Sequence, residues 1–307
     1  MFDSGSERML ILVPAFNEEG AIRRVVLGLR LEVPAATVLV VDDGSADATA
    51  REAEGAGALV VRHPFNLGIG ATVQTGLKYA RHRGYDVVVR VDGDGQHDQA
   101  GIARLCTALH SHHVDAVFGS RFMGTRALMQ IPVARRIGIL CFAAIVTVLT
   151  QQRTTDATSG FFCLNRRAVD VLADLMPQDY PEVESRVVLH KAGLRALEIP
   201  ARMLARRTGI SSIDTWRSIY YAFKVSVAAL ITALKDVPAY PQEAKDCFAG
   251  RRIASQDEGS RAPPIRNPKS EIRNSSKEHH DVDTPCPAGL GAVIQPASAR
   301  GDRAVDP

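Results

Sequence analysis

The chain has 307 residues, of which 46% are hydrophobic and 23% are charged, so it can bury a core of ordinary globular size. A formal net charge of +3, with its basic residues in short clusters, is too small for a general nucleic-acid-binding protein, and we expect no nucleic-acid partner. No cysteines stand at metal-binding spacing and the N-terminus carries no secretory signal pattern, which together predict a cytoplasmic location.

Short, Val-rich runs in the first half of the chain are predicted to be buried strands, because each ends in polar or glycine residues. These runs are residues 9–13, 37–41, 59–62, 87–91 and 114–119. Helix-like stretches lie between them at residues 21–30, 46–54, 71–82 and 100–110. The alternation predicts an α/β fold with a doubly wound, mostly parallel sheet and helices on both faces. In such a sheet, ligands bind beyond the carboxyl ends of the strands.

After residue 120 the alternation loosens. Helices are predicted at residues 133–151, 167–175, 183–192 and 216–235, a strand at 161–164, and a pair of strands within 195–204. We expect residues 1–241 to form the catalytic domain, with residues 1–120 as a nucleotide- and metal-binding half and 121–241 as an acceptor half. From residue 242 to 307, Pro, Ser and charged residues dominate, and this tail is predicted to be disordered because it cannot offset its ordering entropy.

Two apolar stretches, residues 137–150 and 219–234, are shorter than the roughly 20 residues that a membrane-spanning helix requires, so no transmembrane helix is predicted. The first begins beside Arg135 and Arg136, and the second follows Trp216. Basic and aromatic residues beside an apolar face favour helices that lie at a membrane surface. A buried core helix, and a contact with an oligomer or membrane-protein partner, remain open as alternatives.

Three loops at the same predicted sheet edge are rich in carboxylates: residues 14–19, 42–45 and 92–98. Such a cluster repels itself unless a cation or a hydrogen-bonding ligand offsets it, and two Asp separated by one residue, Asp92 and Asp94, suit a hard cation with oxygen ligands. One such pair would usually be a solvated turn. The convergence of three loops predicts instead a Mg²⁺ or Mn²⁺ ion that bridges a diphosphate. We expect the nearby His63 and His97 to be hydrogen-bonding neighbours rather than ligands.

Segments spread over residues 9–235 carry a specific resemblance. In chain order they are Pro14-Ala15-Phe16-Asn17-Glu18, Val41-Asp42-Asp43-Gly44-Ser45, Asn66-Leu67-Gly68-Ile69-Gly70, Asp92-Gly93-Asp94-Gly95-Gln96-His97, Gly119-Ser120-Arg121-Phe122, Ser159-Gly160-Phe161 and Arg206-Arg207-Thr208-Gly209-Ile210-Ser211. Together they resemble the inverting glycosyltransferases of family 2, which have the GT-A fold. Within that family they are similar to the polyprenyl-phosphate sugar synthases, such as dolichol-phosphate mannosyltransferase.

The resemblance implies a metal-dependent transferase that moves a sugar from a nucleotide diphosphate sugar. The residues implied to line the base and ribose are Pro14, Phe16, Glu18, Val41 and Asp43. Those implied to hold the metal and diphosphate are Asp92, Asp94 and Gln96, with Gly93 beside the nucleotide, and those implied to engage phosphates are Arg121 and Arg206. Ser212 stands where the synthases often carry a lysine, which leaves the donor and the acceptor open.

Two acceptors are compatible with these residues. A polyprenyl phosphate at the cytoplasmic face of a membrane needs no general base, because its second pKa is about 6 and it is already anionic near neutral pH. A sugar hydroxyl in cell-envelope polysaccharide would need a base, and the candidates are Asp156 and Glu184. We therefore expect a peripheral membrane enzyme whose acceptor is a polyprenyl phosphate or a glycan.

Other interpretations of the same segments are weaker. A dinucleotide-binding oxidoreductase is indicated by Gly68 and Gly70, but the third glycine is missing at Val73. A phosphohydrolase similar to the haloacid dehalogenases is indicated by Asp92 to Gly95, but there the nucleophile loop usually follows the first strand. A non-enzymatic scaffold would not need Asp92 and Asp94 intact.

Overall fold

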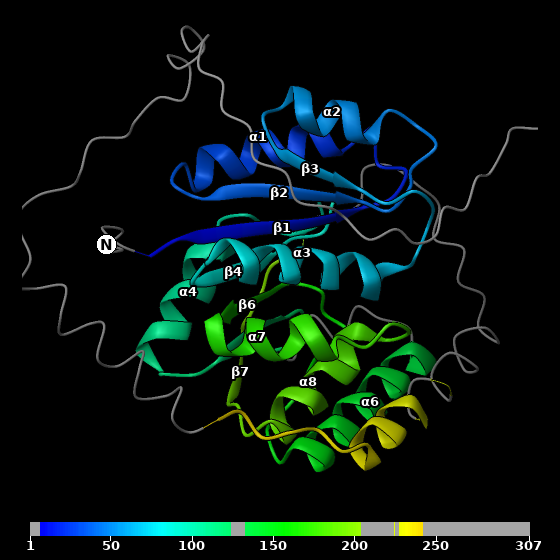
Figure 1. Cartoon of the computed structure of the whole chain (residues 1–307). Coiled ribbons are helices and arrows are strands. Elements are labelled where there is room, and N and C mark those ends of the chain that lie inside the picture. The colour runs from blue at the N-terminus through cyan, green and yellow to red at the C-terminus, as the bar shows by residue number, and fades with distance from the viewer. Residues whose placement is uncertain (1–6, 124–132, 204–223, 225–226, 242–307) are drawn as a thin grey trace, which may run out of the picture. The chain divides into compact units, whose positions relative to one another are not determined.

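The computed structural model describes residues 7–123, 133–203, 224 and 227–241, with the side chains of residues 133–138 excepted. Within these residues, seven strands form one sheet in the order β3-β2-β1-β4-β6-β5-β7 (Figure 1). The strands are β1 Met9–Ala15, β2 Thr37–Asp42, β3 Leu59–Arg62, β4 Val87–Arg90, β5 Ala116–Ser120, β6 Phe162–Asn165 and β7 Ala196–Pro200. Only β6 runs antiparallel to its neighbours among these strands, which confirms the predicted mostly parallel sheet.

Helices cover both faces of the sheet (Figure 1). They are α1 Ile22–Glu32, α2 Thr49–Gly55, α3 Ile69–Arg83, α4 Gly101–Ser111, α6 Val133–Thr150, α7 Arg166–Leu175 and α8 Pro181–Lys191. Side chains of β1 alternate between the two faces: Ile11 and Val13 pack with α1, α2 and α4, whereas Leu10 and Leu12 pack with α3, α7 and α8. Because both faces are buried, the strand is an unbroken apolar run, as parallel strands between helix layers usually are.

The segment 195–204 differs from its prediction. We expected a pair of strands there, but among its described residues there is one strand, β7, which pairs in parallel with β5. Pro200 is the last residue of this strand, which lies at the edge of the sheet, where a proline is tolerated. Met203 instead forms an isolated antiparallel bridge with His97, which brings the end of this segment to the loop after β4.

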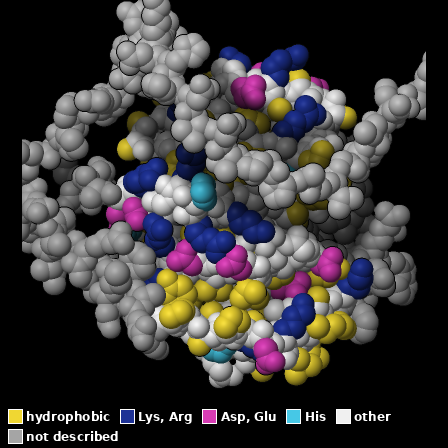
Figure 2. Space-filling model, viewed as in Figure 1, with side chains coloured by type: hydrophobic (Ala, Val, Ile, Leu, Met, Phe, Trp, Pro, Cys, Tyr) yellow, Lys and Arg dark blue, Asp and Glu magenta, His cyan; other side chains and the backbone are white. Residues whose placement is uncertain are grey.

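A smaller apolar cluster joins α6 and α8 to the helical residues 227–234. Around it, hydrophobic side chains also face outward, and Figure 2 shows yellow side chains gathered at the lower end of the molecule, where these helices lie in Figure 1. The exposed ones are Leu140, Val148, Val227, Leu230, Ile231 and Leu234. In the part of the chain that the structure describes, no helix is both long enough and apolar enough to span a bilayer.

Candidate functional site

A cleft of about 450 Å³ opens at the carboxyl ends of β1, β2 and β4, beside the first turn of α3. Its lining residues are Pro14, Ala15, Phe16, Glu18, Asp43, Asn66, Gly68, Ile69, Thr72, Arg90, Asp92, Gly93 and Asp94. The three predicted loops therefore converge, and they bring most of the predicted nucleotide-binding residues into one cleft. Val41 is not among the lining residues, since it is fully buried in the core.

The first two loops are joined by hydrogen bonds between side chains and backbone. The Asn17 amide N–H donates to Ser45 Oγ over 2.9 Å, and the Ala46 N–H donates to Asn17 Oδ1 over 3.0 Å. Thr49 Oγ1 accepts the N–H of Glu18 over 2.7 Å. These polar residues satisfy the backbone of turns that have no strand or helix partner, and they hold the two loops in a fixed relation.

Asp43 presents an ionised carboxylate to the cleft. Its Oδ1 accepts from His63 Nδ1 over 2.7 Å and from the Leu67 N–H over 2.9 Å, while Oδ2 accepts from the Gly68 N–H over 2.8 Å. Burial alone would raise the pKa of Asp43, but these hydrogen bonds outweigh it and the pKa lies below its ordinary value. Gly68 turns its N–H inward at φ +92°, a backbone conformation that favours glycine.

The loop after β4 is fixed by His97. The Asp92 N–H donates to His97 Nδ1 over 3.0 Å, and the imidazole stacks on Phe161 with ring centroids 4.9 Å apart. Because a backbone N–H is always a donor, Nδ1 carries no proton and the neutral ring is protonated on Nε2, which lies 3.6 Å from Asp92 Oδ2. Burial lowers the pKa of His97, which favours this neutral form. Both His63 and His97 therefore form hydrogen bonds with residues of the cleft loops.

The carboxylates of Asp92 and Asp94 lie at the cleft and offer oxygen ligands. Asp94 Oδ1 accepts the Gln96 N–H over 2.9 Å, whereas Gln96 is not among the residues that line the cleft. Within the described ranges, no three His, Cys, Asp or Glu side chains converge as a complete metal cage. The donor set fits Mg²⁺ or Mn²⁺ bound through one or two carboxylates, with the remaining ligands from substrate phosphates and water.

Arg90 was not predicted as a site residue. It lies in β4, lines the cleft, and its Nε and Nη2 contact Asp92 Oδ1 at 3.2 and 3.1 Å. Its Nη2 also lies 2.9 Å from Oε1 of Glu182. Burial would raise the pKa of Asp92, but the charge and hydrogen bonds of Arg90, together with the other neighbouring groups, outweigh this and hold the pKa below its ordinary value. The signal in the sequence was an arginine at the end of an otherwise aliphatic buried strand, because arginine is rarely buried unless it is paired.

Arg121, predicted to bind a phosphate, and Asp156, a candidate general base, contact each other. Arg121 Nε and Nη2 donate to the two carboxylate oxygens of Asp156 over 2.7 and 2.8 Å, and Nη2 also donates to Thr158 Oγ1 over 2.7 Å. The predicted fork of Arg121 on a phosphate is therefore occupied by a carboxylate. Asp156 is fully buried and paired, which argues against it as a general base. Arg206, the other predicted phosphate ligand, lies outside the described residues.

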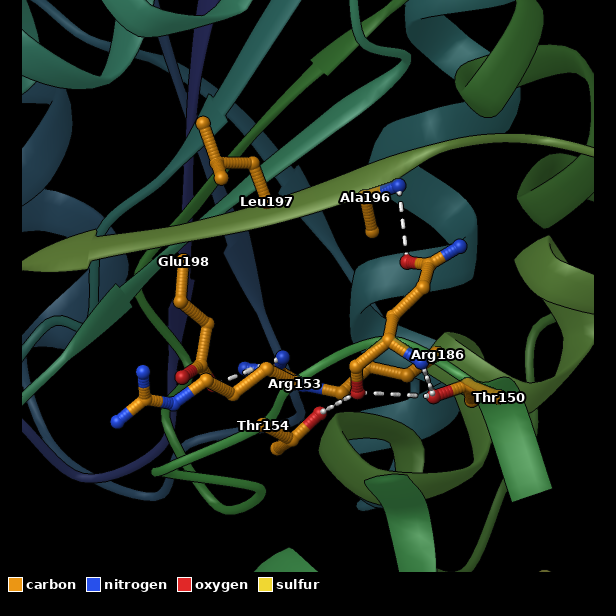
Figure 3. Close-up of a pocket in the computed structure, with 8 residues that line it drawn as sticks. Thr150, Arg153, Thr154, Arg186, Ala196, Leu197 and Glu198 are labelled. Carbon is orange, nitrogen blue, oxygen red and sulfur yellow. Dashed lines mark hydrogen bonds and ion pairs between the residues drawn. The ribbon is translucent and has the colours of Figure 1, made fainter. Parts of the chain in front are cut away.

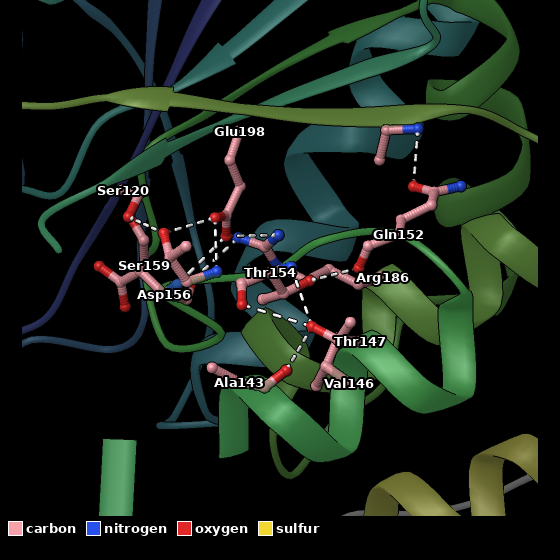
Figure 4. Close-up of polar contacts among 12 residues, drawn as sticks. Ser120, Ala143, Val146, Thr147, Gln152, Thr154, Asp156, Ser159, Arg186 and Glu198 are labelled. Atoms are coloured by element: carbon pink, nitrogen blue, oxygen red, sulfur yellow. Dashed lines mark hydrogen bonds and ion pairs between the residues drawn. The ribbon is translucent and has the colours of Figure 1, made fainter. Parts of the chain in front are cut away.

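A buried network supports the loop that carries Asp156 (Figure 4). The carboxylate of Glu198 accepts from the backbone N–H groups of Thr155 and Asp156 over 2.6 and 3.2 Å. Arg186 Nη1 lies 3.0 Å from Glu198 Oε1, and Arg186 Nη2 donates to the Asp156 carbonyl over 2.9 Å. Beside this network is a cavity of about 10 Å³ (Figure 3), which is too small to admit a substrate. The network is structural support and not a second binding site.

Glu184 does not reach the cleft. It is buried, and its Oε2 accepts a hydrogen bond from Thr232 Oγ1. Glu182 lies on the other side of α8 because two residues are more than half a turn apart on an α-helix, and it is Glu182 that contacts Arg90. Of the two carboxylates in this segment, Glu182 pairs with the cleft residue Arg90, whereas the predicted Glu184 does not.

Comparison with known proteins identifies the family of this chain. The family model described as glycosyl transferase family 2 matches residues 10–172, more than half of the chain. A UDP-N-acetylglucosamine–dolichyl-phosphate N-acetylglucosaminyltransferase of Methanococcus voltae is 28% identical over 213 residues, which cover 63% of this chain and 84% of the relative. An undecaprenyl-phosphate mannosyltransferase of Micrococcus luteus is 29% identical over 216 residues, which cover 67% and 88%.

Among solved structures, the glucosyl-3-phosphoglycerate synthase of Mycobacterium tuberculosis, crystallised with Mn²⁺ and UDP-glucose, aligns with a TM-score of 0.54. The alignment covers 74% of this chain and 79% of that one at 20% identity, which establishes a shared GT-A fold. The extent of the family match, together with the three converging loops, shows that this chain belongs to glycosyl transferase family 2.

Proposed function

We propose that this glycosyltransferase moves a sugar from a nucleotide diphosphate sugar to a polyprenyl phosphate, with inversion of the anomeric carbon and with a bound divalent cation. The observation that carries the proposal is the cleft in which the ionised Asp43 and the carboxylates of Asp92 and Asp94 lie together at the sheet edge. At one end of the cleft, the ionised carboxylate of Asp43 can accept hydrogen bonds from the N–H groups of a nucleobase. At the other end, the carboxylates of Asp92 and Asp94 are hard oxygen ligands that suit a metal-bound diphosphate.

In this proposal, Pro14, Phe16 and Glu18 contact the base and ribose beside Asp43. Asp94 and Asp92 would hold Mg²⁺ or Mn²⁺, which when bound stabilises the negative charge on the departing diphosphate as a Lewis acid. The loops after β1 and β4 are fixed before the ligand arrives. Backbone N–H groups of the first already donate to Ser45 and Thr49, and the Asp92 N–H of the second donates to His97. Such preorganisation lowers the ordering cost of binding.

The acceptor assignment rests on the relatives and on the candidate bases. The two relatives are named for transfer to dolichyl phosphate and undecaprenyl phosphate. In this chain Asp156 is paired with Arg121 and Glu184 is turned toward Thr232, so neither candidate base faces the cleft. A phosphate acceptor requires no base near neutral pH, since its second pKa is about 6. This supports a lipid phosphate over a sugar hydroxyl.

The location in the cell follows from the acceptor in this proposal. The exposed apolar side chains around α6 and residues 227–234 would contact the lipid, and the enzyme would lie peripherally on the cytoplasmic face of the membrane. The same surface fits a contact with an oligomer or with a membrane-protein partner. Sedimentation with anionic vesicles, compared with the oligomeric state in solution, separates these two uses.

Two experiments test the proposal. Thermal shift with UDP, GDP and NAD, each with and without Mn²⁺ or Mg²⁺, should give stabilisation only by a nucleoside diphosphate together with the cation. Stabilisation by NAD alone would refute the donor site. Incubation with radiolabelled nucleotide sugars and a bacterial membrane extract should then label an organic-soluble product that is lost in mild acid. Label in an acid-stable polysaccharide would favour the hydroxyl acceptor.

A further inference from the structure

We infer that Arg90 is a positioning residue: it fixes the Asp92 carboxylate at the cleft and anchors it to helix α8 through Glu182. The inference rests on the proposed donor site. It goes further because it assigns a role to two residues, from two distant parts of the chain, that contact the predicted metal ligand without being ligands themselves.

The contacts place Arg90 between two carboxylates. Its side chain is 3% exposed, and one nitrogen, Nη2, lies 3.1 Å from Asp92 Oδ1 and 2.9 Å from Glu182 Oε1. The other Asp92 oxygen, Oδ2, lies 3.6 Å from His97 Nε2. The Asp92 carboxylate is therefore paired with Arg90 on one side and lies beside His97 on the other, and Arg90 is itself paired with Glu182 in the first turn of α8.

The backbone that covers this cluster leaves no spare room. A Cβ on Gly160 would lie 2.8 Å from Arg90 Nη2 and 3.0 Å from Asp92 Oδ2. The next residue, Phe161, stacks on His97. A larger residue at position 160 would push the guanidinium and the carboxylate apart. The Ser-Gly-Phe segment therefore needs glycine at this position, because its backbone packs directly against the ion pair.

The charges give the arrangement a consequence for cation binding. Arg90 contributes +1 against the carboxylates of Asp92 and Glu182, and a buried arginine of this kind persists only when it is paired. Because Arg90 offsets Asp92, the protein alone should attract a free cation weakly. A nucleoside diphosphate adds both negative charge and oxygen ligands. We therefore expect Mn²⁺ to bind well only together with the nucleotide.

Two substitutions at Arg90 separate its charge from its geometry. In Arg90→Met, the uncompensated carboxylates should bind Mn²⁺ alone about tenfold more tightly, since a unit charge close to a partly buried cation changes binding by at least that much. The same variant should bind the nucleoside diphosphate at least about tenfold more weakly, because a positive charge close to the diphosphate is lost and Asp92 is no longer held in place. Arg90→Lys should restore the wild-type affinity for Mn²⁺ alone but not for nucleotide, because lysine has the charge without the fork.

Glu182→Gln should change the affinity for Mn²⁺ alone in the opposite direction, to severalfold weaker binding. The reason is that a negative charge is lost while Arg90 remains paired with Asp92. The matched control is Arg81→Met, which removes an arginine from a bidentate pair with Asp174 between α3 and α7, outside the cleft. It should leave both affinities unchanged. A purely structural role for Arg90 would lower thermal stability without opposite changes in Mn²⁺ affinity.

The measurements are calorimetric titrations of Mn²⁺ alone, and of the nucleotide that stabilises the wild type in saturating Mn²⁺. If folded Arg90→Met binds both within twofold of the wild type, the inference is overturned. If that variant does not fold, Glu182→Gln and Gly160→Ala decide in its place: unchanged affinities in both overturn it, and weaker nucleotide binding in Gly160→Ala supports it. If the wild type itself shows no Mn²⁺-dependent nucleotide binding, the proposed donor site fails first, and this inference falls with it.

Discussion

Arg121 and Asp156 form a bidentate ion pair in which the carboxylate is fully buried and the arginine side chain is 28% exposed. The pair joins the end of β5 to a loop 35 residues further along the chain. Asp156 also accepts the Arg121 backbone N–H over 3.0 Å. The carboxylate therefore fixes both the main chain and the side chain of the residue that follows β5.

Asp156→Asn should destabilise the protein substantially. Removing one partner of a buried ion pair typically costs 3–5 kcal/mol, and because Arg121 is partly solvated we expect the lower end, about 3 kcal/mol. Urea denaturation at pH 7 measures this. The comparison is Asp174→Asn, whose carboxylate is exposed at 61% and pairs with Arg81, and which should cost well under half as much. Equal losses in the two variants would contradict the argument.

The same pair predicts a dependence of stability on pH. Burial would raise the pKa of Asp156, but the hydrogen bonds and charge of Arg121 outweigh it and hold the pKa below its ordinary value of 3.8. A depressed folded pKa means that the stabilisation is complete well above the unfolded pKa of about 3.9 and is lost as the pH falls through the folded pKa. Between pH 5 and pH 3 the free energy of unfolding should fall less steeply in Asp156→Asn than in the wild type. Parallel curves would count against the assignment.

Asp94→Ala should abolish metal-dependent nucleotide binding and leave the fold intact, because Asp94 lies at the open edge of the sheet rather than in the core. The matched control is Asp98→Ala in the same loop, whose Oδ1 accepts the Ala100 N–H and which does not line the cleft. Calorimetry with a nucleoside diphosphate and Mn²⁺ distinguishes the two variants. Normal binding by Asp94→Ala would show that the site is elsewhere.

Glu184→Gln should retain turnover within about twofold of the wild type, because glutamine can still accept the hydrogen bond from Thr232. If Glu184 were instead the general base, the same change would be expected to cost about 10²–10⁴-fold in rate. Glu184→Ala should reduce stability by about 1–3 kcal/mol, since it leaves the buried Thr232 hydroxyl without its acceptor. Initial rates and thermal melts on the two variants separate the catalytic from the structural role.

Gly70→Ala should destabilise the protein although alanine is the better helix former. A Cβ there would lie 2.4 Å from the Pro177 carbonyl oxygen and 2.5 Å from the Gln178 Cα, so the backbone must move. Overpacking of this kind costs about 1–3 kcal/mol. Gly20→Ala, where nothing lies within 4 Å of the new Cβ, should be nearly neutral. Chemical denaturation of both variants tests the difference. Similar denaturation midpoints would contradict the prediction, because they would mean that α3 and the backbone at Pro177 and Gln178 can move apart at little cost.

The sequence by itself determined the sheet and the position of the cleft. Aliphatic runs such as 9–13 and 37–41 can be buried on both faces only between layers of helices, and the polar residues that end them must then meet at one edge. For that reason Asp43, Asp92 and Asp94 could be placed together from local pattern alone. The motifs around them were specific enough to predict the family that the comparison confirms.

Only the tertiary structure decided which charged groups contact one another. Arg90 meets Glu182 and Arg121 meets Asp156 across long separations in the chain, and Glu184 turns away from the cleft by its place on one helix. These choices depend on the register of β6 against β4 and on the rotation of α8 about its axis, which no local pattern encodes. An ion pair forms within a few ångström, so a one-residue change in register or a half turn of a helix exchanges its partners.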